Sequence, residues 1–132
     1  MRLTIYCTRV TFVDVLSLSN SLKLDRSVIV QQMIDKTVNS MGLSRLPDFL
    51  HSDLGLLLAR RVLFARNERR LPVRVEAQPL EVLRNCSSFS WSKCAVFLLE
   101  RGLDLHFCGA SRPSSVAAGP AHPIGPLSLL KD

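Results

Sequence analysis

The most regular hydrophobic pattern of the chain lies in residues 25–42, DRSVIVQQMIDKTVNSMG. Apolar side chains recur there at helical spacing, and polar side chains cover the other faces. Asp25 or Ser27 can cap the start of a helix, and Gly42 stands where a helix C-terminus favours glycine. The pattern predicts a helix over residues 26–41.

A second helix is expected to begin near Pro47 or Ser52 and to run to about Arg66. Proline is tolerated in the first turn of a helix, and serine is a good N-cap. Apolar residues fall on every side of this segment, which is typical of a buried helix. Arg60 and Arg61 lie inside it, however, and a buried arginine needs a partner.

Two segments alternate between apolar and polar residues, as strands do. Residues 2–18 contain short runs of this kind and predict one or two strands, and residues 73–77 alternate cleanly. Pro72 and Pro79 bracket the second segment, and proline confines a strand to the edge of a sheet. The pattern leaves open whether these strands pair with each other.

The last third of the chain predicts two more helices and a tail. A short helix is expected at residues 80–84, followed by a helix that Ser90 or Ser92 caps and that runs to Arg101. Gly102 then ends that helix.

Residues 97–105 add a local resemblance. Their Leu-Leu-Glu-x-Gly-x-Asp spacing, with Gly102 and Asp104, resembles the second helix and exit loop of an ankyrin repeat. The resemblance covers nine residues, and the Thr-Pro-Leu-His opening of such a repeat is absent. A single repeat cannot bury its own apolar face, so the spacing is interpreted as a helix end rather than as a family signature.

These elements predict a mainly helical α+β fold in one small domain, residues 1–108. The 132 residues of the whole chain fit one domain, and the apolar content of the chain, 47%, is enough for a core. Residues 109–132 hold four of the seven prolines and three of the six glycines, and are predicted to be a disordered or loosely packed tail.

The composition leaves two origins open. Leu, Arg and Ser, which have six codons each, make up 51 of the 132 residues, whereas Glu and Lys number only 4 each. A young or overlapping reading frame with no evolved biochemical activity would have such a composition, and so would an ordinary GC-rich gene.

The strongest functional indication is an arginine-rich segment, residues 60–74. It carries six arginines against one acid, Glu68: Arg60, Arg61, Arg66, Arg69, Arg70 and Arg74. The guanidinium group donates a planar fork of hydrogen bonds that suits phosphate, and the net charge of +6 attracts polyanions. The segment therefore predicts contact with nucleic acid or with an anionic membrane surface, where Leu57, Leu58, Val62 and Phe64 would enter the lipid. An acidic protein partner, or a charged surface that only keeps the chain soluble, fits the same pattern.

Catalytic and metal-binding patterns are weak. The chain has no Gly-x-Ser-x-Gly, Gly-Lys-Ser/Thr or Gly-x-Gly-x-x-Gly motif, so no enzymatic activity and no cofactor are expected. Cys86, Cys94, His106 and Cys108 are suitable metal ligands, but their spacing does not match the usual zinc frameworks, and no metal is expected. Cys94 is expected to be a buried apolar residue.

The N-terminal segment does not fit a secretory signal. Arg9 and Asp14 interrupt its apolar run, and no apolar stretch of the chain is long enough to span a membrane. The protein is therefore expected inside the cell, in a compartment that the sequence does not specify. The main prediction is a non-enzymatic binding or accessory protein that uses residues 60–74.

Overall fold

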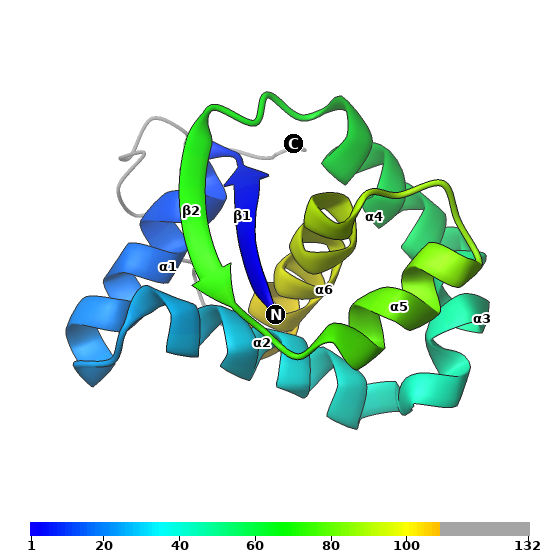
Figure 1. Ribbon diagram of the computed structural model, residues 1–132, viewed down its shortest axis with the longest axis horizontal. Helices are drawn as coiled ribbons and strands as arrows, with labels where there is room; N and C mark the ends of the chain where they lie inside the picture. The colour runs from blue at the N-terminus through cyan, green and yellow to red at the C-terminus, as the bar shows by residue number, and fades with distance from the viewer. Residues whose placement is uncertain (109–132) are drawn as a thin grey trace, which may run out of the picture.

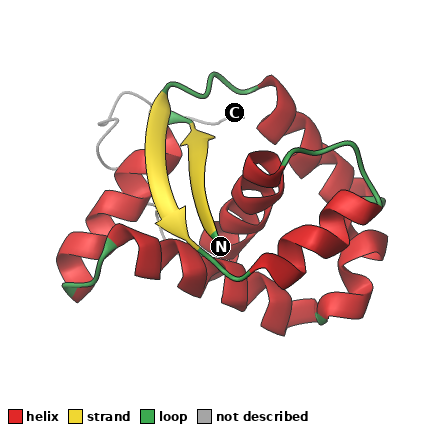
Figure 2. Ribbon diagram, in the orientation of Figure 1, coloured by secondary structure: helices red, strands yellow, loops and turns green. Residues whose placement is uncertain are grey.

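The structure, a computed structural model, describes residues 1–108. Six α-helices, one short 3-10 helix and two strands follow one another along this part of the chain (Figures 1 and 2). In chain order they are β1 (Arg2–Cys7), α1 (Arg9–Leu22), α2 (Arg26–Met41), η1 (Leu43–Arg45), α3 (Leu46–Leu50), α4 (Asp53–Phe64), β2 (Arg69–Arg74), α5 (Ala77–Asn85) and α6 (Trp91–His106). The mainly helical α+β prediction is confirmed, and the fold is one small domain. The predicted tail lies outside the described residues.

Helix α6 forms the centre of the core. All seven side chains from Cys94 to Glu100 are buried, so this helix is enclosed on every side over about two turns. Its most extensive contact is with α2, and β1, α4 and α5 also pack on it (Figure 1). The other elements therefore fold around one buried helix.

Gly102 lies inside α6 because the helix passes very close to α2. A Cβ atom at this position would stand 2.1 Å from the carbonyl oxygen of Met33 in α2. The prediction that α6 ends at Gly102 is wrong, since the helix continues to His106. The ankyrin-like spacing thus reflects close packing of two helices and not a helix end.

The two strands form an antiparallel pair, with Arg2 opposite Arg74 and Tyr6 opposite Arg70. Ile5 and Leu71 are buried beneath the pair, so one face of the sheet covers the core and the other faces solvent. This pairing joins the start of the chain to residues 69–74, a pairing that the sequence pattern left open.

Pro72 lies inside β2 without breaking the strand pair. The backbone N–H of Arg74 donates outward to Ser27 Oγ at 2.6 Å, and that of Tyr6 donates outward to Ser92 Oγ at 3.3 Å. Strand residues two apart have the same orientation, so the nitrogen of Pro72 also faces outward. The proline therefore removes no hydrogen bond between the strands.

Several helix predictions are confirmed in position. Helix α2 spans the predicted residues 26–41. Ser52 caps α4 by accepting a hydrogen bond from the N–H of Gly55, and Ser90 caps α6 by accepting one from the N–H of Lys93. The structure extends the predicted helix at residues 80–84 to α5, Ala77–Asn85.

Other boundaries were predicted wrongly. Residues 9–18 are helical, because Thr8 caps α1 and the buried positions include polar Thr11, which hides the helical spacing from an apolar pattern. Strand β2 lies at 69–74 rather than 73–77, since α5 begins at Ala77. Of the two expected starts of the second helix, Ser52 is correct and Pro47 is not, because Pro47 belongs to the separate helix α3. Helix α4 ends at Phe64, shortly before the expected end near Arg66.

Candidate nucleic-acid interface

The six arginines of residues 60–74 do not form one surface. Arg60 and Arg61 lie on α4, Arg66 lies in the loop before β2, and the other three lie on β2: Arg69, Arg70 and Arg74. All six are exposed. The neighbours of each guanidinium group therefore decide which of them is available to an anion.

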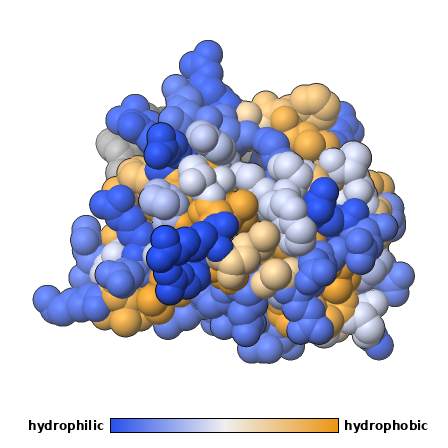
Figure 3. Space-filling model, viewed as in Figure 1, coloured by the Kyte–Doolittle hydropathy of each residue, from blue (hydrophilic) through white to orange (hydrophobic). Residues whose placement is uncertain are grey.

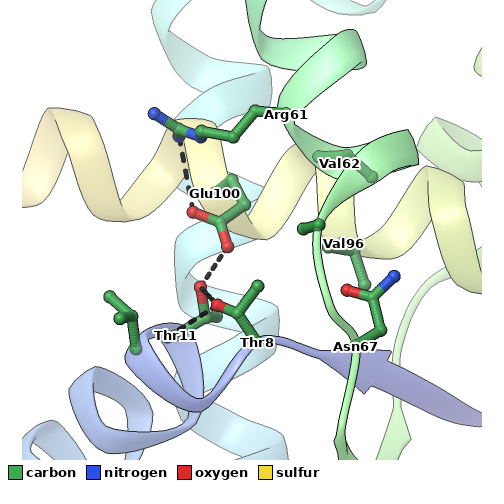
Figure 4. A pocket seen from close by; sticks show the side chains of 9 residues that line it. Thr8, Thr11, Arg61, Val62, Asn67, Val96 and Glu100 are labelled. Carbon is green, nitrogen blue, oxygen red and sulfur yellow. Dashed lines mark hydrogen bonds and ion pairs between the residues drawn. The ribbon is translucent and has the colours of Figure 1, made fainter.

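Arg61 is held by two carboxylates of α6. Its Nη2 lies 3.4 Å from Oε1 of Glu100 and 3.2 Å from Oδ2 of Asp104. Glu100 is buried and also accepts a hydrogen bond from the Thr11 hydroxyl, which in turn accepts one from Thr8 (Figure 4). Because two negative charges face this one guanidinium group, Arg61 contributes little to an anion-binding surface.

A pocket of about 280 Å³ lies between α1, α4 and α6, and Thr8, Thr11, Arg61 and Glu100 line it. Val62 and Val96 form an apolar wall, and Asn67 approaches from the loop before β2 (Figure 4). The Thr8–Thr11–Glu100–Arg61 chain of hydrogen bonds borders its polar side. This network links the start of α1 to α4 and α6. It therefore stabilises the junction where β1 passes into α1.

Arg69 is directed toward α1. Its guanidinium carbon lies 5.9 Å from the centre of the Phe12 ring, and Arg26 lies 5.6 Å from the same ring. Arg69 pairs with buried Cys7 across the strands, which places it on the opposite side of the sheet from Arg70. A cation–π contact of this kind fixes the side chain locally.

Four of the six arginines remain: Arg60 on α4, Arg66 in the following loop, and Arg70 and Arg74 together on β2. Arg70 and Arg74 both lie on the solvent-exposed side of that strand. They alternate with buried Leu71 and Val73, so their side chains share one face. Their partners across the strand pair are Tyr6 and Arg2, and Thr4 and Pro72 lie between them. We call this surface the sheet face: Arg2, Thr4, Tyr6, Arg70, Pro72 and Arg74. In Figure 3, hydrophilic side chains are interspersed with paler and hydrophobic ones over the region of the two strands.

Tyr6 and Arg70 are direct neighbours on the sheet face. The outward N–H groups of Tyr6 and Arg74 show that these positions belong to pairs without interstrand hydrogen bonds. In such pairs the Cβ atoms stand about 4.5–5.5 Å apart. Tyr6 is 48% exposed, so an aromatic ring reaches solvent from the position opposite Arg70.

The sheet face is electropositive. Among residues 1–108, no ion pair joins Arg2, Arg70 or Arg74 to a carboxylate, in contrast to Arg61. Arg2 and Arg74 stand opposite each other, which brings two positive charges together at one end of the pair. Like charges directly opposite each other cost stability, and a bound anion relieves this cost.

Two residues of the sheet face, Arg2 and Tyr6, were missed from the sequence. They alternate with Leu3, Ile5 and Cys7, so the strand pattern alone places them on the exposed side. The missing information was the partner strand, which brings them beside arginines more than 60 residues away in the chain.

Two of the four cysteines, Cys7 and Cys94, are buried thiols. Within residues 1–108, no three His, Cys, Asp or Glu side chains lie close enough together to hold a metal ion. Cys94 is fully buried, as predicted, and burial raises the pKa of its thiol to about 12. Burial, assisted by the charge of Glu100, raises the pKa of the Cys7 thiol to about 11. Both thiols are therefore protonated at neutral pH.

The chain matches no protein-family model, no curated protein and no solved structure. None of the helices formed by residues 1–108 has the length and apolar character needed to cross a membrane. The function is therefore inferred from the geometry and chemistry of the chain itself.

Proposed function

We propose that this protein is a non-enzymatic binding protein that contacts single-stranded nucleic acid through the sheet face. The observation that carries the proposal is the exposed ring of Tyr6 opposite Arg70, with Arg2 and Arg74 at the other end of the same surface. Arg70 and Arg74 belong to the arginine-rich segment 60–74, and β1 adds the aromatic side chain that this segment lacks.

The chemistry of these side chains suits a single strand better than a duplex. Guanidinium groups bind phosphate oxygens through parallel hydrogen bonds. An exposed aromatic ring stacks on a base, and only an unpaired strand offers a free base face. Tyr6 stands opposite Arg70, so a phosphate bound by Arg70 would lie beside the stacked base. Arg74 is four strand residues, about 13 Å, from Arg70 and could bind a phosphate further along the strand.

Fluorescence anisotropy with labelled oligouridylate, oligothymidylate and duplex DNA tests the proposal. Three phosphate contacts predict that log K falls with log salt at a slope of about −2 for single strands. Replacing Arg2, Arg70 and Arg74 by Gln removes about 1 kcal/mol for each exposed contact, and should weaken binding about 100-fold.

The matched control replaces three exposed cations elsewhere, Arg9, Lys36 and Arg45, by Gln, which changes the net charge by the same amount. The proposal predicts that this control loses much less affinity than the sheet-face variant. Equal losses in the two variants would show non-specific attraction to a basic protein and would refute a defined site. Tighter binding to the duplex would refute the stacking role of Tyr6.

The alternative prediction, a young or overlapping reading frame with no evolved biochemical activity, has a separate test. A cooperative thermal melt together with the expected salt slope argues against it. A gradual melt and no measurable affinity for any of the three probes would favour it.

A further inference from the structure

Helix α4 has an unusual outer face. Its buried side consists of four residues, Gly55, Leu58, Ala59 and Val62. The exposed side also carries large apolar residues among its charges: Leu54, Leu56, Leu57, Leu63 and Phe64. Phe64 is 82% exposed and Leu57 is 64% exposed, and seven residues, or two turns, separate them on one stripe.

This arrangement corrects two expectations from the sequence. The helix is not buried all round, so Arg60 needs no buried partner. Leu58 and Val62, predicted to enter a membrane, instead pack into the core. Figure 3 shows an apolar patch at the upper right, over the region where α4 ends in Figure 1.

Contiguous apolar patches of this kind mark interaction sites on soluble proteins. The charges around the patch indicate the kind of partner. Arg60 lies on the outer face, one turn from both Leu57 and Phe64, and exposed Arg66 follows the helix. Lys93 donates a hydrogen bond to the carbonyl oxygen of Val62 at 3.2 Å, which adds a third cation at the C-terminal end of α4. Asp53, the acid of the helix, stands at its other end.

We propose that the outer face of α4, from Leu57 to Phe64, docks the protein on an anionic phospholipid surface. Leu57, Leu63 and Phe64 enter the boundary between headgroups and acyl chains, and Arg60 and Arg66 bind headgroup phosphates. A purely apolar protein partner would have to desolvate Arg60 without a counter-charge, whereas a lipid headgroup supplies one. The surface is separate from the sheet face, so this proposal does not depend on nucleic-acid binding.

Vesicle sedimentation tests the proposal with two lipid compositions: phosphatidylcholine alone, and phosphatidylcholine mixed with phosphatidylserine. The native protein should sediment with the mixed vesicles and only weakly with pure phosphatidylcholine. The Leu57→Ser/Phe64→Ser variant removes two exposed apolar contacts and should bind the mixed vesicles about 10- to 100-fold more weakly. Arg60→Gln/Arg66→Gln should reduce the preference for phosphatidylserine.

The matched control is Leu22→Ser/Val28→Ser, which removes two exposed apolar side chains of α1 and α2. This control should bind vesicles like the native protein, and all variants should have native melting temperatures because the changed residues are exposed. Equal binding of the native and Leu57→Ser/Phe64→Ser proteins would overturn the proposal. So would equal affinity for the two vesicle types. A native dimer that the Leu57→Ser/Phe64→Ser change dissociates, together with no vesicle binding, would assign the patch to a second copy of the chain.

Nucleic-acid binding separates the two proposals. The Leu57→Ser/Phe64→Ser variant should keep the oligouridylate affinity of the native protein, because neither residue lies on the sheet face.

Discussion

Substitution of Gly102 tests the packing around the central helix, on which the position of the sheet depends. A Cβ atom at Gly102 would lie 2.1 Å from the Met33 carbonyl oxygen and 2.8 Å from the Met33 Cα. Ordinary contact begins near 3.4 Å, so α2 and α6 would have to separate by about 1 Å. Overpacking of this kind costs about 1–3 kcal/mol, and here the upper end applies because the clash is with backbone.

Alanine recovers about 1 kcal/mol of helix propensity over glycine. Gly102→Ala should therefore destabilise the protein by about 2 kcal/mol, which corresponds to a fall of about 10 °C in Tm. Gly102→Asn should be worse, at about 3 kcal/mol, because the side chain is larger and the gain in propensity smaller. Thermal melts followed by circular dichroism give both values, and Asn39→Ala on the exposed side of α2 is the control that should not destabilise.

Asparagine distinguishes packing from a helix end. If Gly102 ended the helix in a left-handed conformation, asparagine would be tolerated better than alanine, because it adopts that conformation readily. A Gly102→Asn protein at least as stable as Gly102→Ala would therefore refute the close contact between α2 and α6.

Three further predictions follow from the site and the core. Tyr6→Ala should weaken oligouridylate binding about 10- to 100-fold while Tyr6→Phe keeps it, since stacking is worth about 1–3 kcal/mol per base; anisotropy titrations measure both. Glu100→Gln should lower stability by about 1 kcal/mol, because the charge that faces Arg61 is lost while an acceptor for Thr11 remains; a native Tm would contradict the role of this carboxylate. Folding raises the pKa of the Cys7 and Cys94 thiols from 9.0 to about 11 and about 12. Between pH 9 and 12 these thiols therefore ionise more readily in the unfolded chain, so the free energy of unfolding should fall as the pH rises. Urea melts of the native and Cys94→Ala proteins over this pH range test the prediction.

The sequence predicted elements better than it predicted their partners. Residues 26–41 form a helix as expected, because their apolar positions and the glycine that follows carry the signal locally. The start of α1 was missed because Thr11, a polar residue, is fully buried and bonded to Glu100, 89 residues away. No local pattern contains that contact.

The candidate site was also predicted only as far as its local pattern allowed. Six arginines in fifteen residues indicated a basic surface, but tertiary contacts divided them. Glu100 and Asp104 form ion pairs with Arg61. Arg69 makes a cation–π contact with Phe12. Arg70 and Arg74, in contrast, lie opposite Tyr6 and Arg2 of a strand that is distant in the sequence. Charge density along a sequence therefore identified the segment and not the surface.

Amide chemical-shift mapping with a short oligouridylate is the most direct test of the sheet face as the binding surface. The largest shift changes should fall on residues 2–6 and 70–74, and they should disappear in the Arg2→Gln/Arg70→Gln/Arg74→Gln protein. Changes centred on α4, or changes spread evenly over all exposed arginines, would contradict a defined nucleic-acid site on this sheet.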